Sequence, residues 1–98
     1  IIFDEIDTGV SGEVSNKIAT IMNDMANHMQ VITITHLPQI ASQGQQHYKV
    51  YKGEENGVTT SNLRLLSYDD RVAEIAEMLS GKDYSESALT HAKELLTK

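Results

Sequence analysis

Hydrophobic residues follow two different patterns in the first third of the chain. Residues 1–3 are continuously apolar, which is typical of the end of a strand buried on both faces, and residues 31–35 form a second, β-branched strand. Between them, apolar residues recur at the spacing of one helix face, and Ser11 is placed to cap that helix. The apolar positions are Val14, Ile18, Ile21, Met22, Met25 and Met29. A strand, a helix and a second strand predict a βαβ unit with parallel strands.

The middle of the chain predicts a short helix followed by a β-hairpin. Pro38 is expected in the first turn of a helix that begins after the second strand, and Gly44 is expected to end that helix. Residues 48–52 and 59–66 have the composition of strands, and the Asn-Gly pair at 56–57 between them is a strong hairpin signal. An antiparallel pair is therefore expected after the parallel unit.

The last third of the chain predicts two amphipathic helices. Asp69 or Asp70 is expected to cap the first helix, which ends near Gly81, and Ser85 is expected to cap the second. Their apolar positions are Val72, Ile75, Ala76 and Leu79, then Leu89, Ala92, Leu95 and Leu96. Together the elements predict an α/β fold with a parallel βαβ unit, a β-hairpin and two C-terminal helices.

Charge and cysteine content exclude several functional classes. The chain has 98 residues and a net charge of −6, which argues against a protein that coats nucleic acid by electrostatics alone. It has no cysteine, so thiolate metal sites and disulfides are excluded and an intracellular setting is favoured. No apolar run approaches the roughly 20 residues that span a bilayer, so no membrane partner is expected. Lys49, Lys52 and Arg64 share the predicted hairpin, where we expect a solvated face rather than DNA contact.

Acidic side chains cluster directly after the first strand. Asp4, Glu5 and Asp7 lie where this strand leaves the sheet, and His36 follows the second strand. Because the carboxyl ends of parallel strands meet at one edge of a sheet, we expect Asp4, Glu5 and His36 to converge there. One carboxylate can hold a hydrated Mg²⁺, its neighbour can orient water, and an imidazole can donate to a phosphate oxygen. The order of these residues predicts a phosphate-handling site.

Two other interpretations use the same residues differently. A small Mg²⁺-dependent phosphohydrolase would use Asp4, Glu5 and Asp7 directly, because clustered carboxylates can bind a metal without a phosphate-binding loop. In a non-catalytic interaction module, the hairpin at 48–66 and the two terminal helices would form the binding surface. Taken singly, acids at a strand end and a histidine after a strand are more often capping or surface groups.

Several motifs of the chain occur together in one class of ATPase. Residues 1–5 (IIFDE), 6–9 (IDTG) and 35–36 (TH) resemble the Walker B motif, D-loop and H-loop of the ATP-binding-cassette class. Within this class, the chain is similar to the RecN family of bacterial DNA-repair proteins, which are relatives of the SMC proteins. The segments that carry this second resemblance are residues 4–12, 36–41, 71–81 and 89–96.

The resemblance implies a role for each candidate residue. Asp4 would hold the Mg²⁺ of Mg-ATP through water, and Glu5 would polarise the attacking water. His36 would contact the γ-phosphate, and Asp7 would reach the opposing subunit of a homodimer whose heads sandwich the nucleotide. Proteins of this family would bind DNA and act in double-strand-break repair and recombination within the SOS response. A cytoplasmic, nucleoid-associated location is also implied.

The chain lacks the other motifs of this class. A phosphate-binding loop needs the pattern GxxxxGK[ST], and none of the six glycines builds it. Residues 79–82 (LSGK) imitate the Leu-Ser-Gly-Gly signature, but they end a predicted helix after the second strand, whereas the signature precedes Walker B. We therefore expect residues 1–98 to be the C-terminal portion of an SMC-type P-loop ATPase head, without Walker A, Q-loop or signature. The full-length protein is expected to hydrolyse ATP and the chain alone to be inactive.

Overall fold

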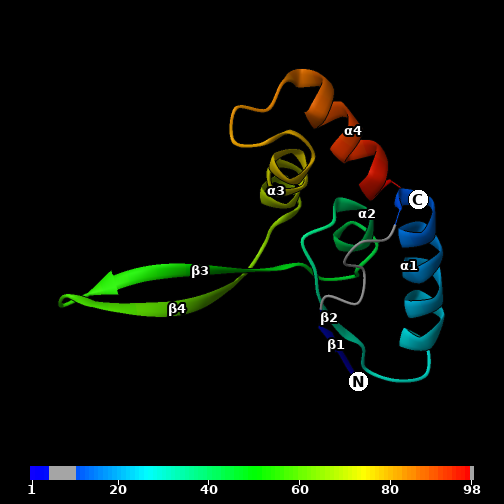
Figure 1. The fold of residues 1–98 in the computed structure, drawn as a ribbon, viewed down its shortest axis with the longest axis horizontal. Coiled ribbons are helices and arrows are strands. Elements are labelled where there is room, and N and C mark those ends of the chain that lie inside the picture. The colour runs from blue at the N-terminus through cyan, green and yellow to red at the C-terminus, as the bar shows by residue number, and fades with distance from the viewer. Residues whose placement is uncertain (5–10, 98) are drawn as a thin grey trace.

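The computed structural model describes residues 1–4 and 11–97, which contain four strands and four helices. In chain order, the first four elements are β1 (Ile2–Asp4), α1 (Gly12–Ala26), β2 (Ile32–Ile34) and α2 (Pro38–Ala41). The next four are β3 (Tyr48–Glu55), β4 (Val58–Leu65), α3 (Tyr68–Ser80) and α4 (Glu86–Leu96). In Figure 1, β3 and β4 extend away from the helices as an arm, while β1 and β2 lie side by side.

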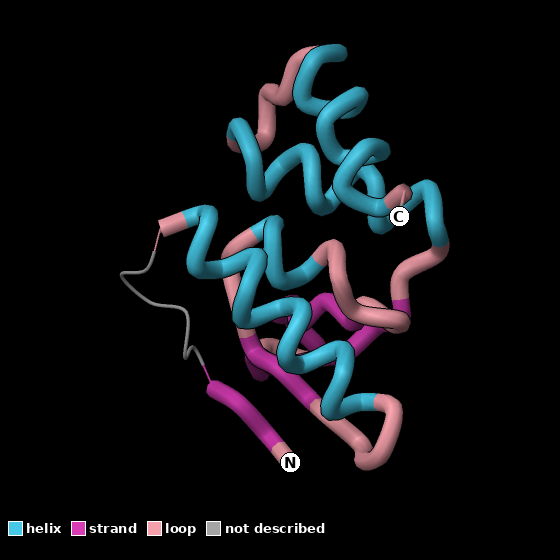
Figure 2. Tube along the Cα trace, turned by 90° about the vertical axis from the view of Figure 1, so that its right-hand side faces the viewer, coloured by secondary structure: helices cyan, strands magenta, loops and turns pink. Residues whose placement is uncertain are grey.

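Strands β1 and β2 pair in parallel, which confirms the predicted βαβ unit. Phe3 lies opposite Thr33 in the ladder, and the last residue of β1, Asp4, lies opposite Ile34. Phe3 packs against the buried side of α1, and the Thr33 hydroxyl donates to the Met22 sulfur of that helix at 3.1 Å. Figure 2 shows α1 running in front of the two strands. One face of this strand pair is therefore covered by α1.

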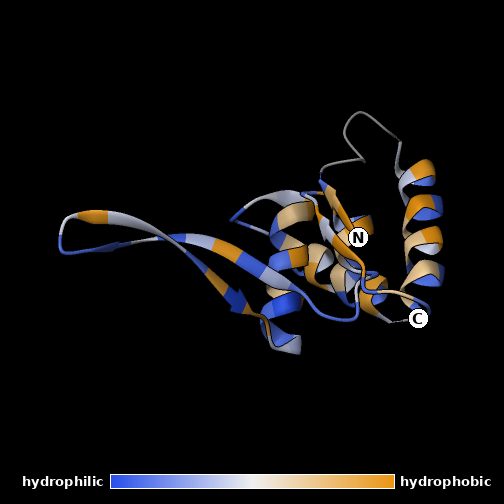
Figure 3. Cartoon of the chain, turned by 90° about the horizontal axis from the view of Figure 1, so that it is seen from below, coloured by the Kyte–Doolittle hydropathy of each residue, from blue (hydrophilic) through white to orange (hydrophobic). Residues whose placement is uncertain are grey.

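The other face of the strand pair is uncovered, which contradicts the expected burial of the first strand on both faces. Alternation along the strands places Ile2, Ile32 and Ile34 on the side away from α1. These side chains are 66%, 46% and 52% exposed, respectively. In Figure 3, the strand at the N-terminus is coloured as hydrophobic. The prediction was wrong for this chain because none of its described elements packs on that side.

Helix α1 begins as predicted, and its buried face matches the predicted stripe in part, because Met22 is buried and Ile18 packs against the core. The Ser11 side chain caps it by accepting from the Val14 backbone N–H at 3.4 Å. Val14 and Ile21, expected on the buried face, are 44% and 60% exposed, and Met29 lies beyond the end of the helix. The buried positions are Ser15, Ala19 and Met22. Small residues on this stripe let α1 approach its neighbours closely, which apolar periodicity alone does not reveal.

Helix α2 is a single turn. Pro38 occupies its first turn, as expected, but the helix ends at Ala41 rather than at Gly44. Ser42 is the C-terminal cap residue and its backbone N–H donates to the Pro38 carbonyl at 3.0 Å. Gly44 instead lies in the following loop, where a Cβ atom added to it would lie 3.2 Å from the Gln46 carbonyl oxygen. The glycine therefore marks a close backbone approach rather than the end of the helix.

The hairpin is longer than predicted. β3 and β4 have eight residues each, and Tyr48 pairs with Leu65 at the base while Glu55 pairs with Val58 at the tip. The two turn residues Asn56 and Gly57 have φ values of 53° and 76°. These left-handed conformations are those of a two-residue type I′ turn, which matches the twist of the flanking strands.

Helices α3 and α4 form the best-buried part of the chain. Ser67 caps α3 by accepting from the Asp70 backbone N–H, so the expectation that Asp69 or Asp70 would be the cap residue was wrong by two or three residues. Gly81 ends α3 with φ 86°, which confirms that residues 79–82 end a helix, and Ser85 caps α4 as predicted. The shared core consists of Val72, Ile75, Ala76, Ala88 and Ala92.

Candidate functional site

The parallel ladder brings two of the predicted site residues to one edge of the strand pair. Asp4 ends β1, and its ladder partner Ile34 ends β2, two residues before His36. Asp4 and His36 are both exposed. The carboxylate and the imidazole therefore lie at the carboxyl ends of neighbouring parallel strands, where ligands bind in open α/β sheets. Their chemical roles remain a prediction.

The other two predicted site residues cannot be placed. Glu5 and Asp7 lie outside the described residues. Among the residues that the structure describes, no group of three or more histidine or acidic side chains is arranged to hold a metal ion. The described part of the predicted site therefore supplies one carboxylate, that of Asp4, as a possible ligand for a hydrated Mg²⁺.

The turn that carries His36 is fixed on both sides of the histidine. The Leu37 backbone N–H donates to the Thr35 hydroxyl at 3.1 Å, which closes the chain around His36. The Leu37 carbonyl accepts from the backbone N–H groups of Ile40 and Ala41, at 3.2 and 3.0 Å. The same residue thus starts α2 and closes the turn, so the direction of the histidine depends on the placement of α2.

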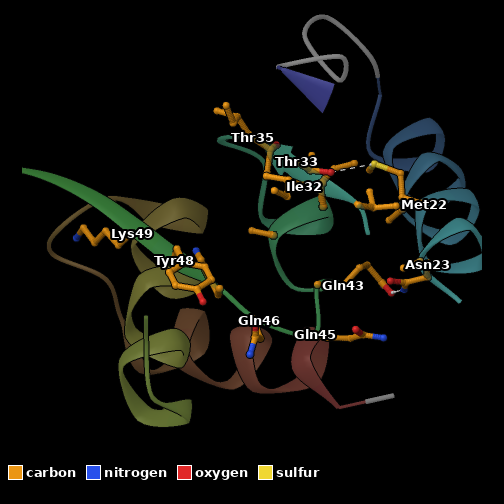
Figure 4. A pocket seen from close by; sticks show the side chains of 18 of the residues that line it. Met22, Asn23, Ile32, Thr33, Thr35, Gln43, Gln45, Gln46, Tyr48 and Lys49 are labelled. Atoms are coloured by element: carbon orange, nitrogen blue, oxygen red, sulfur yellow. Dashed lines mark hydrogen bonds between the residues drawn. The ribbon is translucent and has the colours of Figure 1, made fainter. Parts of the chain in front are cut away.

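A cleft of about 910 Å³ extends from this turn toward the base of the hairpin (Figure 4). Its walls come from α1, β2, the loop after α2 and the start of β3, and they include Ile32, Ile34, His36, Tyr48 and Val50. The wall is apolar at the uncovered face of β2 and polar along the glutamine-rich loop at 43–46.

Two of the three hairpin cations are paired with helix α3. Lys49 and Arg64 lie opposite each other in the ladder. Lys49 Nζ lies 2.7 Å from Glu74 Oε2, and this hydrogen bond raises the pKa of the lysine. Arg64 Nη1 lies 3.8 Å from Asp70 Oδ2. The pairs fasten the base of the hairpin to α3, while Lys52 is exposed.

A residue that sequence reasoning missed, Arg71 on α3, connects three parts of the chain. Its Nη2 donates to the carbonyl oxygens of Ala41 and Ser42, at 3.0 and 3.3 Å, and to that of Gly44. Burial lowers the pKa of this arginine. The one signal in the sequence was a cation in an amphipathic helix, next to the buried Val72. The carbonyl groups that Arg71 contacts lie about 30 residues away, so no local pattern reveals them.

Comparison with known proteins shows what this arrangement is similar to. The DNA repair protein RecN of Deinococcus radiodurans is 48% identical over 96 residues, which cover 98% of this chain and 17% of that protein. RecN of Bacillus subtilis is 44% identical over 96 residues, again 98% of this chain and 17% of that protein. The predicted resemblance to RecN is confirmed. The RecN-like chain spans about 17% of the length of these curated relatives.

The fold is also similar to that of a solved structure. A solved structure described as "Structural biochemistry of ATP-driven dimerization and DNA stimulated activation of SMC ATPases" matches with a TM-score of 0.64 and 19% identity. The match covers 82% of the RecN-like chain and 47% of the solved chain. The predicted SMC-type α/β fold is therefore confirmed. No family model matches the chain. Within the described residues, no helix is both long and apolar enough to cross a membrane.

Proposed function

We propose that residues 1–98 are the C-terminal portion of the ATPase head of a RecN-type DNA-repair protein, and that they supply groups that act on the terminal phosphate of ATP. One observation carries the proposal: the parallel register puts the end of β1, with Asp4, beside the end of β2, which leads to His36. Similarity to RecN proteins over 98% of the chain and the SMC-type fold support it.

The roles follow from the chemistry of phosphoryl transfer, which is catalysed mainly by positioning and by electrostatic stabilisation. Asp4, exposed at the strand end, offers the oxygen donors that Mg²⁺ prefers and would hold it through water. When bound, Mg²⁺ neutralises charge on the phosphate oxygens. Glu5, next along the chain, would accept a proton from the attacking water, and His36 would donate a hydrogen bond to a γ-phosphate oxygen.

The remaining parts of the proposal concern the whole protein. Asp7 would contact the opposing subunit of a homodimer in which two heads enclose ATP, and DNA would bind elsewhere in the protein. The acidic net charge of −6 is consistent with a segment that does not itself hold DNA. The phosphate-binding loop would come from other segments of the protein, because this chain contains no such motif.

Replacing Glu5 by Gln in a full-length RecN protein that contains this chain tests the proposal. The amide cannot accept the proton, so turnover should fall about 10²–10⁴-fold, the usual contribution of a positioned general base. Binding of a fluorescent ATP analogue, measured by titration, should stay within about two-fold of wild type because binding groups are kept. Near-normal turnover in Glu5→Gln would contradict the proposed role.

The alternative of a small Mg²⁺-dependent phosphohydrolase predicts a different result. In that case the isolated 98-residue chain would hydrolyse ATP or p-nitrophenyl phosphate when Mg²⁺ is added, and Asp4→Asn would abolish the activity. The proposed function expects no turnover by the isolated chain. Release of phosphate, measured with and without Mg²⁺, separates the two functions.

A further inference from the structure

Helix α2, directly after His36, cannot hold its own shape. It has four residues, far fewer than the roughly 12–15 that an isolated helix needs in water. Its N-cap residue Leu37 makes no side-chain capping hydrogen bond, and its last turn contains no basic residue. The backbone N–H groups of Ser42 and Gln43 donate to the Pro38 and Ile40 carbonyls, so the carbonyl of Ala41, the last residue of the helix, needs a donor from another segment.

Arg71 supplies that donor from helix α3. One guanidinium nitrogen, Nη2, donates to the Ala41 carbonyl at 3.0 Å, to the Ser42 carbonyl at 3.3 Å and to that of Gly44. No carboxylate pairs with Arg71 among the described residues, so its charge is directed at backbone oxygens. Arg71 thus acts as a C-terminal cap for α2 that is provided by another helix.

The guanidinium is itself held in place. Arg71 lies in the second turn of α3, and its backbone N–H donates to the carbonyl of the cap residue Ser67 at 2.8 Å. The next residue, Val72, is 5% exposed and belongs to the core shared by α3 and α4. The position of the guanidinium at the end of α2 therefore depends on the well-packed α3–α4 pair.

The opposite side of α2 is held by helix α1. Ile40 is 5% exposed and packs against Ala19 and Met22. The Asn23 side-chain amide donates to the Gln43 side-chain oxygen at 3.2 Å, an interaction drawn in Figure 4. Because α1 holds α2 mainly through apolar contact, which is not directional, the hydrogen bonds of Arg71 fix its orientation.

We propose that Arg71 is a positioning residue for His36. By capping α2, it fixes the Leu37 carbonyl on which the helix starts, and hence the turn between Thr35 and Leu37 that carries the imidazole. The inference rests on the proposed function, because it matters for catalysis only if His36 contacts the γ-phosphate. A displacement of about 1 Å in a positioned group can lower a rate about 10²-fold.

The test compares Arg71→Met with Arg71→Lys and Arg64→Met in a full-length RecN protein that contains this chain. Methionine keeps the apolar part of the side chain but cannot donate, so kcat for ATP should fall about 10–100-fold with KM within about two-fold. Lysine can still donate to the carbonyls and should recover most of the turnover. Arg64→Met removes an exposed arginine that pairs with α3 but not with α2, and it should leave kcat unchanged.

A double substitution distinguishes positioning from general destabilisation. If Arg71 acts through His36, Arg71→Met should have no further effect on kcat once His36 is replaced by Ala, whereas independent defects would multiply. If the two substitutions lower kcat by the product of their separate effects, or if Arg71→Met keeps full turnover, the positioning role of Arg71 is wrong, while the proposed function of His36 still stands. Unchanged turnover in His36→Ala would overturn the proposed function of His36 and the inference with it.

Discussion

The α3–α4 pair and the β1–β2 pair are both built from apolar residues, yet only the helix pair is enclosed. Ile75, Ala76 and Ala92 are fully buried at 0% exposure, whereas Ile2 and Ile34 are 66% and 52% exposed. Each helix has one apolar stripe, and the two stripes cover each other. In the strand pair, α1 covers the face with Phe3 and Thr33, and the apolar Ile2, Ile32 and Ile34 lie on the other face. The apolar residues of the sequence thus show which surfaces favour burial. Whether such a surface is buried depends on which other elements pack against it.

The uncovered face is consistent with a segment that belongs in a larger sheet. The chain spans about 17% of the length of its RecN relatives, so most of such a protein lies outside it. A parallel strand pair with helices on both faces is the usual setting for continuously apolar strands. We expect other segments of the protein to cover Ile2, Ile32 and Ile34.

The largest effect on stability is expected in the helix pair. Replacing Ile75, which is fully buried, by Ala removes core contacts and leaves a cavity, and should lower the free energy of unfolding by about 2–5 kcal/mol. The same change at Ile2 should cost less than about 1 kcal/mol, because that side chain is mostly in water. Urea unfolding of the 98-residue chain, followed by circular dichroism, measures both. Equal losses would mean that the strand pair is as tightly packed as the helices.

A smaller effect is expected from the cap of α4. Ser85 accepts from the Ala88 backbone N–H, and Ser85→Ala should lower the free energy of unfolding by about 1 kcal/mol. Ser61→Ala changes an exposed serine on β4 that caps no helix; it is the matched control and should change the free energy of unfolding by less than about 0.5 kcal/mol. If both variants unfold at the same urea concentration, the cap does not stabilise the helix pair.

A weaker, pH-dependent effect is expected where the hairpin meets α3. Burial lowers the pKa of His47 below 6.5, and the nearby Arg71 lowers it further. The unfolded chain therefore binds more protons than the folded chain just below that pH. The contribution of neutral His47 is present above about pH 6.5 and is lost as pH falls toward its folded pKa.

Urea unfolding between about pH 5 and 7.5 measures this contribution, because unfolding linked to protonation gives stability a slope with pH. His47→Gln should flatten the slope, since glutamine does not titrate in this range. His91→Gln changes an exposed histidine on α4 and serves as the control. A slope that is unaltered in His47→Gln would show that the joint between hairpin and α3 does not exclude a charged imidazole.

The smallest effect on stability, and the sharpest test of the uncovered face, is expected from Ile2→Lys. The free energy of unfolding should change by less than about 0.5 kcal/mol, but self-association of the chain should decrease because a charge interrupts an exposed apolar face that can pack against another copy. Val58→Lys, at the 61%-exposed hairpin tip, is the matched control. Sedimentation velocity of the two variants and of the parent chain measures their self-association. A parent chain that stays monomeric at high concentration would refute the expectation.

The sequence predicted only those parts of the site that depend on the order of neighbouring residues. The sequence placed Asp4 and His36 at the ends of two parallel strands, and the ladder confirms that these strands are parallel and that Asp4 lies opposite Ile34, two residues before His36. It did not reveal Arg71, because a donor on one helix and three carbonyls about 30 residues away have no common periodicity. Nor did it reveal that Glu74 would bind Lys49, which depends on how the hairpin docks on α3.

By itself, the sequence determined features that depend on a few neighbouring residues. Ser11 and Ser85 cap helices through their own hydroxyls, and Asn56-Gly57 turns the hairpin because both residues accept positive φ. Only the tertiary structure decided which apolar residues of α1 are buried, where α2 ends, and which apolar strand surface stays exposed. These outcomes depend on contacts between distant segments, whose free energy is set by shape and proximity rather than by the identity of one residue.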